Sequence, residues 1–166
     1  GPTPKFYGTS GRKFGPLTMQ QGSSQNPKFW GPEIGFARAL WDAGERNFAV
    51  VKASRGGGGN GFWDKGAADD HMYQHVVKTV TAASELLAVT SKKQVEIPVI
   101  FYLQGESNSA KGAAVADTLL ETLLTNLRED LPNAKSAKLI LGGIGARGAP
   151  RDLTRQKQRD LAARRK

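Results

Sequence analysis

Short apolar segments alternate with longer amphipathic segments along this chain, and that alternation limits the fold more than any other feature. The short segments are 47–54 (NFAVVKAS), 97–103 (IPVIFYL) and 137–145 (AKLILGGIG), and each is typical of a buried strand. Helices are predicted over 31–44, over about 69–88, along a stripe from Val115 to Leu127, and after Pro150. Strands that alternate with helices predict an α/β fold, with a mostly parallel sheet and helices on both faces.

The first predicted helix has clear end signals and an apolar stripe. Pro32 suits a first helical turn, Glu33 suits the positive N-terminal end, and Gly44 is a stop. The stripe consists of Ile34, Phe36, Ala37, Leu40 and Trp41. Before this helix, residues 1–30 are rich in Gly, Pro, Ser, Gln and Lys without any period. They are predicted to be an irregular N-terminal segment that precedes an α/β domain over 31–166.

The net charge of +9 is concentrated at the C-terminal end. Residues 151–166 contain seven Lys or Arg and two Asp, a net of +5. A basic helix can bind phosphates, but no aromatic-studded strand accompanies it, so a solvated face is favoured over nucleic-acid binding. No apolar stretch approaches the ~20 residues of a membrane-spanning helix. The absence of cysteine excludes disulfides, thiol catalysis and thiolate metal sites.

Ligand sites in parallel α/β sheets form at the carboxyl ends of the strands, which here directs attention to residues 54–66, 104–112 and 142–150. The first of these loops carries four consecutive glycines, Gly56–Gly59. A phosphate cradle is disfavoured because neither G-x-G-x-x-G nor G-K-[ST] is present. Composition alone leaves two interpretations of the loop open. One is an oxyanion hole built from backbone N–H groups, and the other is a flexible turn.

Four blocks then carry a resemblance: GPEIGFARAL, VVKASRGGGGNGFW, FYLQGESN and RQKQRDLAA. Their order and spacing resemble SGNH-type hydrolases of the branch that contains sialate O-acetylesterases and acetylxylan esterases. Gly56, Gly57 and Trp63 match that branch's G-G-T-S-L-x-x-W block, and Gln104 to Ser107 match its H-Q-G-E-S-D block. Leu103 and Asn108 depart from the histidine and the aspartate of the second block. The resemblance implies a three-layer, flavodoxin-like fold, with an incomplete sheet where family segments are absent.

The resemblance also implies a serine esterase mechanism that removes O-acetyl groups from sugars. The tetrahedral oxyanion would be held by the backbone N–H of Gly57 and the side-chain amide of Gln104. Gly56, Gly58, Glu106 and Trp63 would contact the substrate, with Glu106 orienting its loop rather than acting as an acid or base. No cofactor or metal is implied, the partner is an acetylated carbohydrate, and an extracytoplasmic location is favoured.

The family's nucleophile motif, G-Q-S-N, and its D-x-x-H motif have no counterpart in this sequence. Ser10 in YGTSGR is the nearest imitation of the nucleophile, and every Asp lacks a His three residues later. His71 and His75 could share a metal at i, i+4, but no third ligand is identifiable, so solvated histidines are favoured.

Two functions therefore stay open. One is a fragment or truncated form of a carbohydrate esterase. The other is a catalytically inactive SGNH-like module that binds a glycan or protein, using Trp30, Phe62 and Trp63 if these aromatics are exposed rather than buried over the loops. A partial sheet would also expose an edge that could pair with a second copy.

Overall fold

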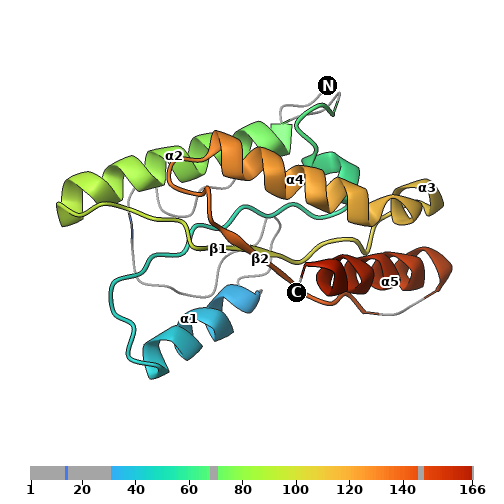
Figure 1. Ribbon diagram of the computed structural model, residues 1–166, viewed down its shortest axis with the longest axis horizontal. Helices are drawn as coiled ribbons and strands as arrows, with labels where there is room; N and C mark the ends of the chain where they lie inside the picture. Colours follow the sequence, from blue (N-terminus) through green and yellow to red (C-terminus); the bar gives the residue numbers. More distant parts are fainter. Residues whose placement is uncertain (1–13, 15–30, 68–70, 146–147, 166) are drawn as a thin grey trace. The chain divides into compact units, whose positions relative to one another are not determined.

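The computed structural model describes residue 14 and residues 31–67, 71–145 and 148–165, and the structural statements below concern those residues (Figure 1). The chain divides into two compact units, unit 1 (Gly1–Arg55) and unit 2 (Gly56–Lys166). Ser10 and Trp30 lie outside the described residues, as does nearly all of the irregular segment expected over 1–30. The expected domain boundary at residue 31 therefore stays a prediction.

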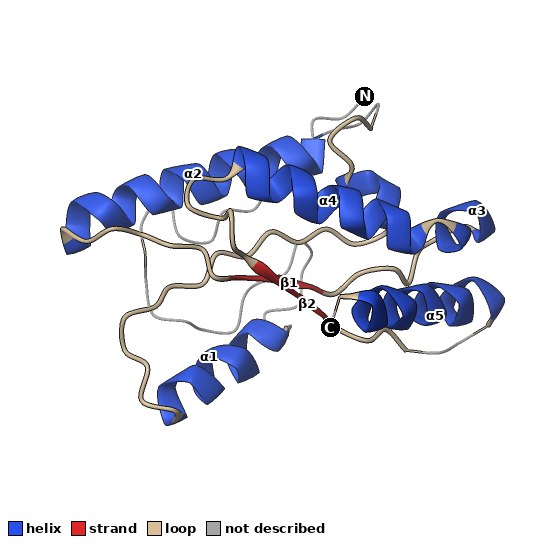
Figure 2. Cartoon of the chain, viewed as in Figure 1, coloured by secondary structure: helices blue, strands red, loops and turns tan. Residues whose placement is uncertain are grey.

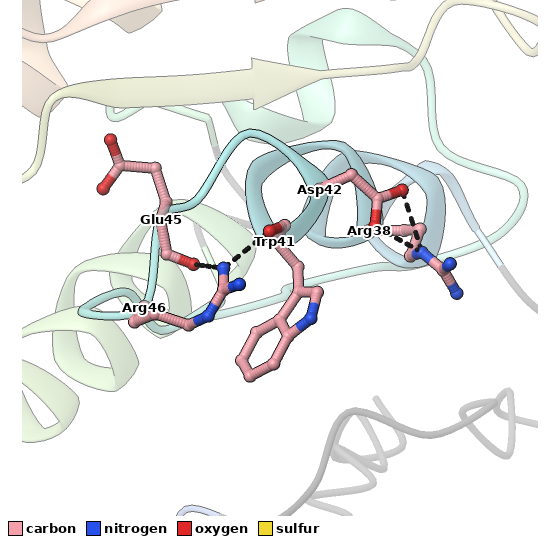
Figure 3. Close-up of polar contacts among 5 residues, drawn as sticks. All are labelled: Arg38, Trp41, Asp42, Glu45 and Arg46. Atoms are coloured by element: carbon pink, nitrogen blue, oxygen red, sulfur yellow. Dashed lines mark hydrogen bonds and ion pairs between the residues drawn. The ribbon is translucent and has the colours of Figure 1, made fainter.

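Unit 1 contains one described helix, α1 (Pro32–Asp42), with Pro32 in its first turn as expected. Glu33 is buried, and its carboxylate accepts hydrogen bonds from the backbone N–H of Gly31 (3.2 Å) and from the Lys52 ammonium (2.7 Å). Trp41, on the apolar stripe predicted for this helix, has a side chain that is 53% exposed. The Arg46 guanidinium instead lies 3.9 Å from the centroid of the Trp41 ring and donates to two backbone carbonyls (Figure 3).

Residues 47–54 form no strand in the structure, which corrects the prediction of a buried strand there. Within the described residues this segment pairs with no other strand, and Phe48 and Val51 are each 37% exposed. An apolar run alone does not make a strand, because a strand also needs a hydrogen-bonding partner for its backbone.

Unit 2 begins with the 3₁₀ turn η1 (Asn60–Trp63) and the long helix α2 (His71–Ser91). Strand β1 (Val99–Tyr102) follows, then α3 (Ala110–Ala114) and α4 (Ala116–Asp130), strand β2 (Lys138–Leu141) and α5 (Ala149–Arg164) (Figure 2). Val115 separates α3 from α4 and is 47% exposed, so it departs from the apolar face predicted from Val115 to Leu127. The other predicted helices of unit 2 are confirmed within a few residues at each end.

The described sheet has two strands, β1 and β2, which pair in parallel with Phe101 opposite Ile140. The connection between them runs through α3 and α4, the helical crossover that parallel strands require. Phe101 and Ile140 are each 39% exposed, so the expectation that these strands are covered on both faces was wrong for this side of the sheet. A mixed α/β fold with a parallel sheet is confirmed.

The core of unit 2 is centred on α4, which buries Leu120, Leu123, Leu124 and Leu127 along one face. Those leucines have the i, i+3, i+4, i+7 spacing of an amphipathic helix, as the sequence predicted. Helix α4 contacts η1 and α5, and α5 also contacts α3. These contacts bring the glycine loop, the loop after β1 and the start of α5 close to one another.

Candidate functional site

Gln104, two residues beyond the end of β1, is buried and held at both ends of its amide. Its Nε2 donates to the carbonyl oxygen of Gly58 at 2.6 Å. Its Oε1 accepts from the backbone N–H of Gly105 at 2.5 Å. Because the acceptor end is occupied by a backbone N–H, the orientation of the amide is fixed with its NH₂ toward the glycine loop.

The glycine loop that Gln104 contacts needs glycine for two different reasons. Gly57 has a φ of +80°, a left-handed conformation that residues with a side chain rarely adopt. Gly59 lies so close to Asn108 that an added Cβ would come within 2.8 Å of the Asn108 Oδ1. Within the described residues, no acceptor is found for the backbone N–H of Gly57. The loop therefore combines a close approach with a donor that a bound oxygen could use.

Asn108 connects three segments that are far apart in the sequence. Its Oδ1 accepts from the backbone N–H of Asn60 at 2.8 Å, at the start of η1. Its Nδ2 donates to the Thr154 Oγ1 at 3.0 Å, and the Thr154 hydroxyl in turn donates to the carbonyl of Pro150 at 2.8 Å. Asn108 and Thr154 are buried, so these bonds fix the glycine loop against α5.

Gly105 allows this close packing between the loop after β1 and α5. Its φ is +133°, and an added Cβ would lie 2.7 Å from the Thr154 Cγ2. Helix α5 is attached at a second point by Gln158, whose Nε2 donates to the Gln104 carbonyl at 3.0 Å. Gln104 is thus bonded through its side chain to the glycine loop and through its backbone to α5.

Several buried polar atoms around this network lack a partner in the described part of the chain. They are both side-chain atoms of Asn60, the Trp63 Nε1, the Tyr102 hydroxyl and the Gln158 Oε1. Burial, and then the negative charge of Glu106, raise the pKa of Tyr102 well above its ordinary value, so its phenol stays protonated at neutral pH. Buried polar groups of this kind cost stability unless water or a ligand forms hydrogen bonds with them. A cluster of such groups is typical of a functional site.

The predicted site residues are only partly brought together. Gly56, Gly57 and Gly58 lie in the loop that Gln104 contacts through Gly58. Trp63 is only 8% exposed and packs edge-on against Tyr102 with ring centroids 6.3 Å apart, so burial is the one of its two open alternatives that the structure shows. The Glu106 side chain is exposed, and its backbone carbonyl accepts from Arg151 at 3.0 Å.

No metal centre can be built from the described residues, which contain no group of three or more His, Cys, Asp or Glu able to hold an ion. His75 is half-buried on α2, and burial lowers its pKa below the ordinary value. None of the described helices combines the length and the apolar character that crossing a bilayer requires.

Asn108, Thr154 and Gln158 were not predicted from the sequence as parts of this network. Asn108 was noted only as a departure from an aspartate. The signal for the other two was their i, i+4 spacing, which places two hydrogen-bonding side chains on one face of the last helix.

Comparison with known proteins gives one family and one solved structure. The family described as "Carbohydrate esterase, sialic acid-specific acetylesterase" matches residues 13–165. The X-ray structure of a protein from Arabidopsis thaliana superposes with a TM-score of 0.68 at 26% sequence identity. The match covers 87% of this chain and 56% of the plant protein, so this chain corresponds to little more than half of that relative. A search among curated proteins found no match.

Proposed function

Because the chain belongs to the carbohydrate esterase family of sialic acid-specific acetylesterases, we propose that it takes part in removing O-acetyl groups from sugars. The reaction would proceed by attack of a serine on the acetyl carbonyl, formation of an acetyl-enzyme and hydrolysis by water. The oxyanion formed in each step would be stabilised by the backbone N–H of Gly57 and the Gln104 amide.

The observation that carries this proposal is the amide of Gln104, which points at the glycine loop and is held by bonds at both ends. An oxyanion donor must be fixed before the reaction, because reorganising it during catalysis costs part of the stabilisation. One hydrogen of Nε2 is used by Gly58, and the other can face an acyl oxygen. Gly56, Gly58 and Glu106 would shape the approach to this point.

Ser10 is the candidate nucleophile. No Asp is followed by a His three residues later, so a D-x-x-H base is absent from this sequence. Without a base, a serine hydroxyl is a poor nucleophile. The buried polar atoms near Gln104 that lack a partner among the described residues support a second candidate function, a module that binds acetylated glycans without turnover.

Hydrolysis of p-nitrophenyl acetate and of an O-acetylated sugar by the full chain tests the proposal. Turnover above buffer is expected, with a loss of about 10²–10³ in rate for Gln104→Ala and complete loss for Ser10→Ala. Gln156→Ala is the matched control, because Gln156 is an exposed glutamine of α5 that, among the described residues, hydrogen-bonds only to Asp160. Folding of each variant is checked by circular dichroism.

Two results would count against an esterase. Turnover that is equal in Gln104→Ala and Gln156→Ala would remove Gln104 from the mechanism. No turnover by the unmodified chain, together with measurable binding of the acetylated sugar, would support the binding module instead.

A further inference from the structure

Trp41, near the end of α1 in unit 1, is the most exposed aromatic side chain among the described residues, at 53%. A tryptophan ring with this much area in contact with water gains free energy when a ligand covers it. A single exposed apolar side chain is common on protein surfaces, so the surroundings of the ring must decide whether it forms a binding site.

Arg46 covers one face of the Trp41 ring. Its guanidinium carbon lies 3.9 Å from the ring centroid, as expected for a cation stacked on an aromatic face. The same guanidinium donates through Nη1 to the carbonyl oxygens of Trp41 at 2.6 Å and Glu45 at 2.9 Å (Figure 3). Arg46 is therefore fixed to the backbone at the end of α1 and holds the ring from one side. Because that face is covered, the exposed area belongs mainly to the opposite face and to the ring edge.

A polar pair lies beside the ring on the same helix. The Arg38 Nε donates to both carboxylate oxygens of Asp42 at 2.9 Å, and the two side chains are 76% and 57% exposed. Arg38 precedes Trp41 by three residues, and residues at this spacing are neighbours on a helix surface. The bonds found among the described residues leave both NH₂ groups of Arg38 available, so hydrogen-bond donors and acceptors adjoin the ring (Figure 3).

We propose that this surface binds a neutral pyranose ring of a polysaccharide, stacked on the open face of Trp41. A pyranose with equatorial substituents has a flat face of C–H groups, which packs on an indole as another apolar ring does. Its hydroxyl groups lie at the rim of that face, where one donates to Asp42 and another accepts from Arg38. Arg46 disfavours a cationic ligand, because a second cation would meet a ring that already carries a positive charge.

The polar pair also argues against an apolar partner. An apolar helix laid on Trp41 would remove water from Arg38 and Asp42 without replacing its hydrogen bonds, which costs free energy. A sugar replaces that water with hydroxyl groups. The inference rests on the proposed function only in the choice of a carbohydrate, because the chain belongs to a family of carbohydrate esterases. The surface recognises the C–H face of a sugar and requires neither an acetyl group nor a charge on it.

An open platform of this kind binds weakly and acts by anchoring. One indole covers one sugar ring and no wall encloses it, so a short oligosaccharide should have an affinity on the order of millimolar. Repeated sugar units along a polymer raise the effective concentration of binding positions. The surface would thus keep the chain on the polymer backbone while acetyl groups are removed elsewhere.

The test is a titration of the full chain with xylotetraose, cellotetraose and sorbitol, observed through the indole N–H signals in NMR. The protein has three tryptophans, and the signal of Trp41 is the one that is absent from Trp41→Phe. Both tetrasaccharides are expected to shift this signal. Sorbitol has the hydroxyl groups without a rigid C–H face and should bind at least fivefold more weakly. Equal binding of sorbitol, or no shift with either tetrasaccharide, overturns the proposal.

Trp41→Ala should weaken binding of both tetrasaccharides at least tenfold. Because the side chain is exposed, the circular dichroism of this variant should match that of the unmodified chain. Phe48→Ala removes another exposed aromatic side chain of unit 1 and should change binding by less than twofold. Equal weakening in the two variants overturns the proposal, as does a Trp41 signal that responds to protein concentration and not to sugar.

Binding and catalysis can fail separately in these experiments. The tetrasaccharides carry no acetyl group, so their binding is measured whether or not the chain hydrolyses esters. Any turnover of p-nitrophenyl acetate should stay within twofold in Trp41→Ala, because this ester has no sugar ring to stack. Loss of that turnover in Trp41→Ala would mean that the ring acts in catalysis and would contradict a role in anchoring.

Discussion

Two faces of α5 are attached to the rest of unit 2 by different chemistry. One face carries Thr154 and Gln158, spaced i, i+4, and is held by neutral hydrogen bonds to Asn108 and Gln104, and all four residues are buried. The other face carries Lys157 and Arg164, spaced i, i+7, and is held by ion pairs at Asp117, which contacts Lys157 at 3.5 Å and Arg164 at 3.1 Å. A further exposed pair joins Arg165 to Glu121 at 3.5 Å.

The two kinds of attachment differ in how much movement of the helix they allow. Buried neutral hydrogen bonds are directional, are little affected by salt, and cost stability when one partner is removed. Ion pairs with a partly exposed basic partner accept a wider range of geometries and are screened by salt. The face of α5 that borders the proposed active site is therefore the face that cannot shift without losing buried hydrogen bonds.

The largest effect is expected for Gly105→Ala, at the contact between the loop after β1 and α5. The added Cβ would lie 2.7 Å from the Thr154 Cγ2, at a φ of +133°. Strain and overpacking together should lower the free energy of unfolding by roughly 3 kcal/mol. Urea denaturation measures this loss, and Gly61→Ala is the control, since its Cβ would meet nothing within 4 Å.

A second substitution separates the two causes. Thr154→Ser removes the Cγ2 and keeps the hydroxyl, so Gly105→Ala/Thr154→Ser should recover part of the loss relative to the sum of the single variants. Strict additivity would mean that the contact with Thr154 is not the source of the cost.

Removal of the Asn108 side chain should have the next largest effect. Asn108→Ala leaves the buried N–H of Asn60 without an acceptor, at a cost of about 2 kcal/mol in thermal or urea unfolding. Asn108→Asp keeps the acceptor but loses the donor to Thr154. Its stability should rise as the pH is lowered through the pKa of the new carboxyl group, because the protonated form can again donate. A pH-independent deficit would contradict this account of the bond.

Asp117→Asn should have a smaller effect that depends on pH. Burial favours the protonated form of Asp117, but the hydrogen bond from Arg164 and the charge of Lys157 outweigh it and lower the pKa below 3.8. The folded state thus favours the carboxylate, and its stabilisation is present above about pH 4 and lost as the pH falls through the folded pKa. The variant should lose about 1 kcal/mol at pH 7 and differ little from the unmodified chain near pH 2. An equal deficit at both pH values would exclude the ion pair as the cause.

The smallest effect is expected for Arg165→Gln. Both partners of this pair are more than a third exposed, so the loss should stay below about 0.5 kcal/mol in low salt. Molar sodium chloride should abolish it in thermal unfolding. A larger, salt-resistant loss would mean that the two faces of α5 are not attached by different chemistry.

The helices and the parallel pairing could be predicted from the sequence because they depend on local periodicity. The leucines of α4 follow helical spacing, and β1 and β2 are short apolar runs separated by a crossover of sufficient length. The expected strand at 47–54 failed because its apolar character says nothing of a pairing partner. The exposure of Trp41 could not be predicted, because an apolar stripe on a helix does not show which of its residues a neighbouring segment covers.

The candidate site was predictable only where a motif carried it. Gln104 and the glycine loop came from the resemblance, and the structure places Gln104 in hydrogen-bond contact with Gly58. The oxyanion role of Gly57 and Gln104 stays a prediction. The bonds of Asn108 and Gln158 span 46 and 54 residues of sequence. No local pattern specifies such pairs, because they depend on how the helices pack in three dimensions.

The open face of the sheet at Phe101 and Ile140 has a practical consequence for handling the protein. The Phe101 and Ile140 side chains lie on paired positions of the two strands, so they form a small apolar patch in contact with water. The hydrophobic attraction between two such patches is entropic, and it strengthens on warming from near freezing. Cold, dilute samples should therefore stay monodisperse, and turbidity should develop on gentle heating before any helix melts.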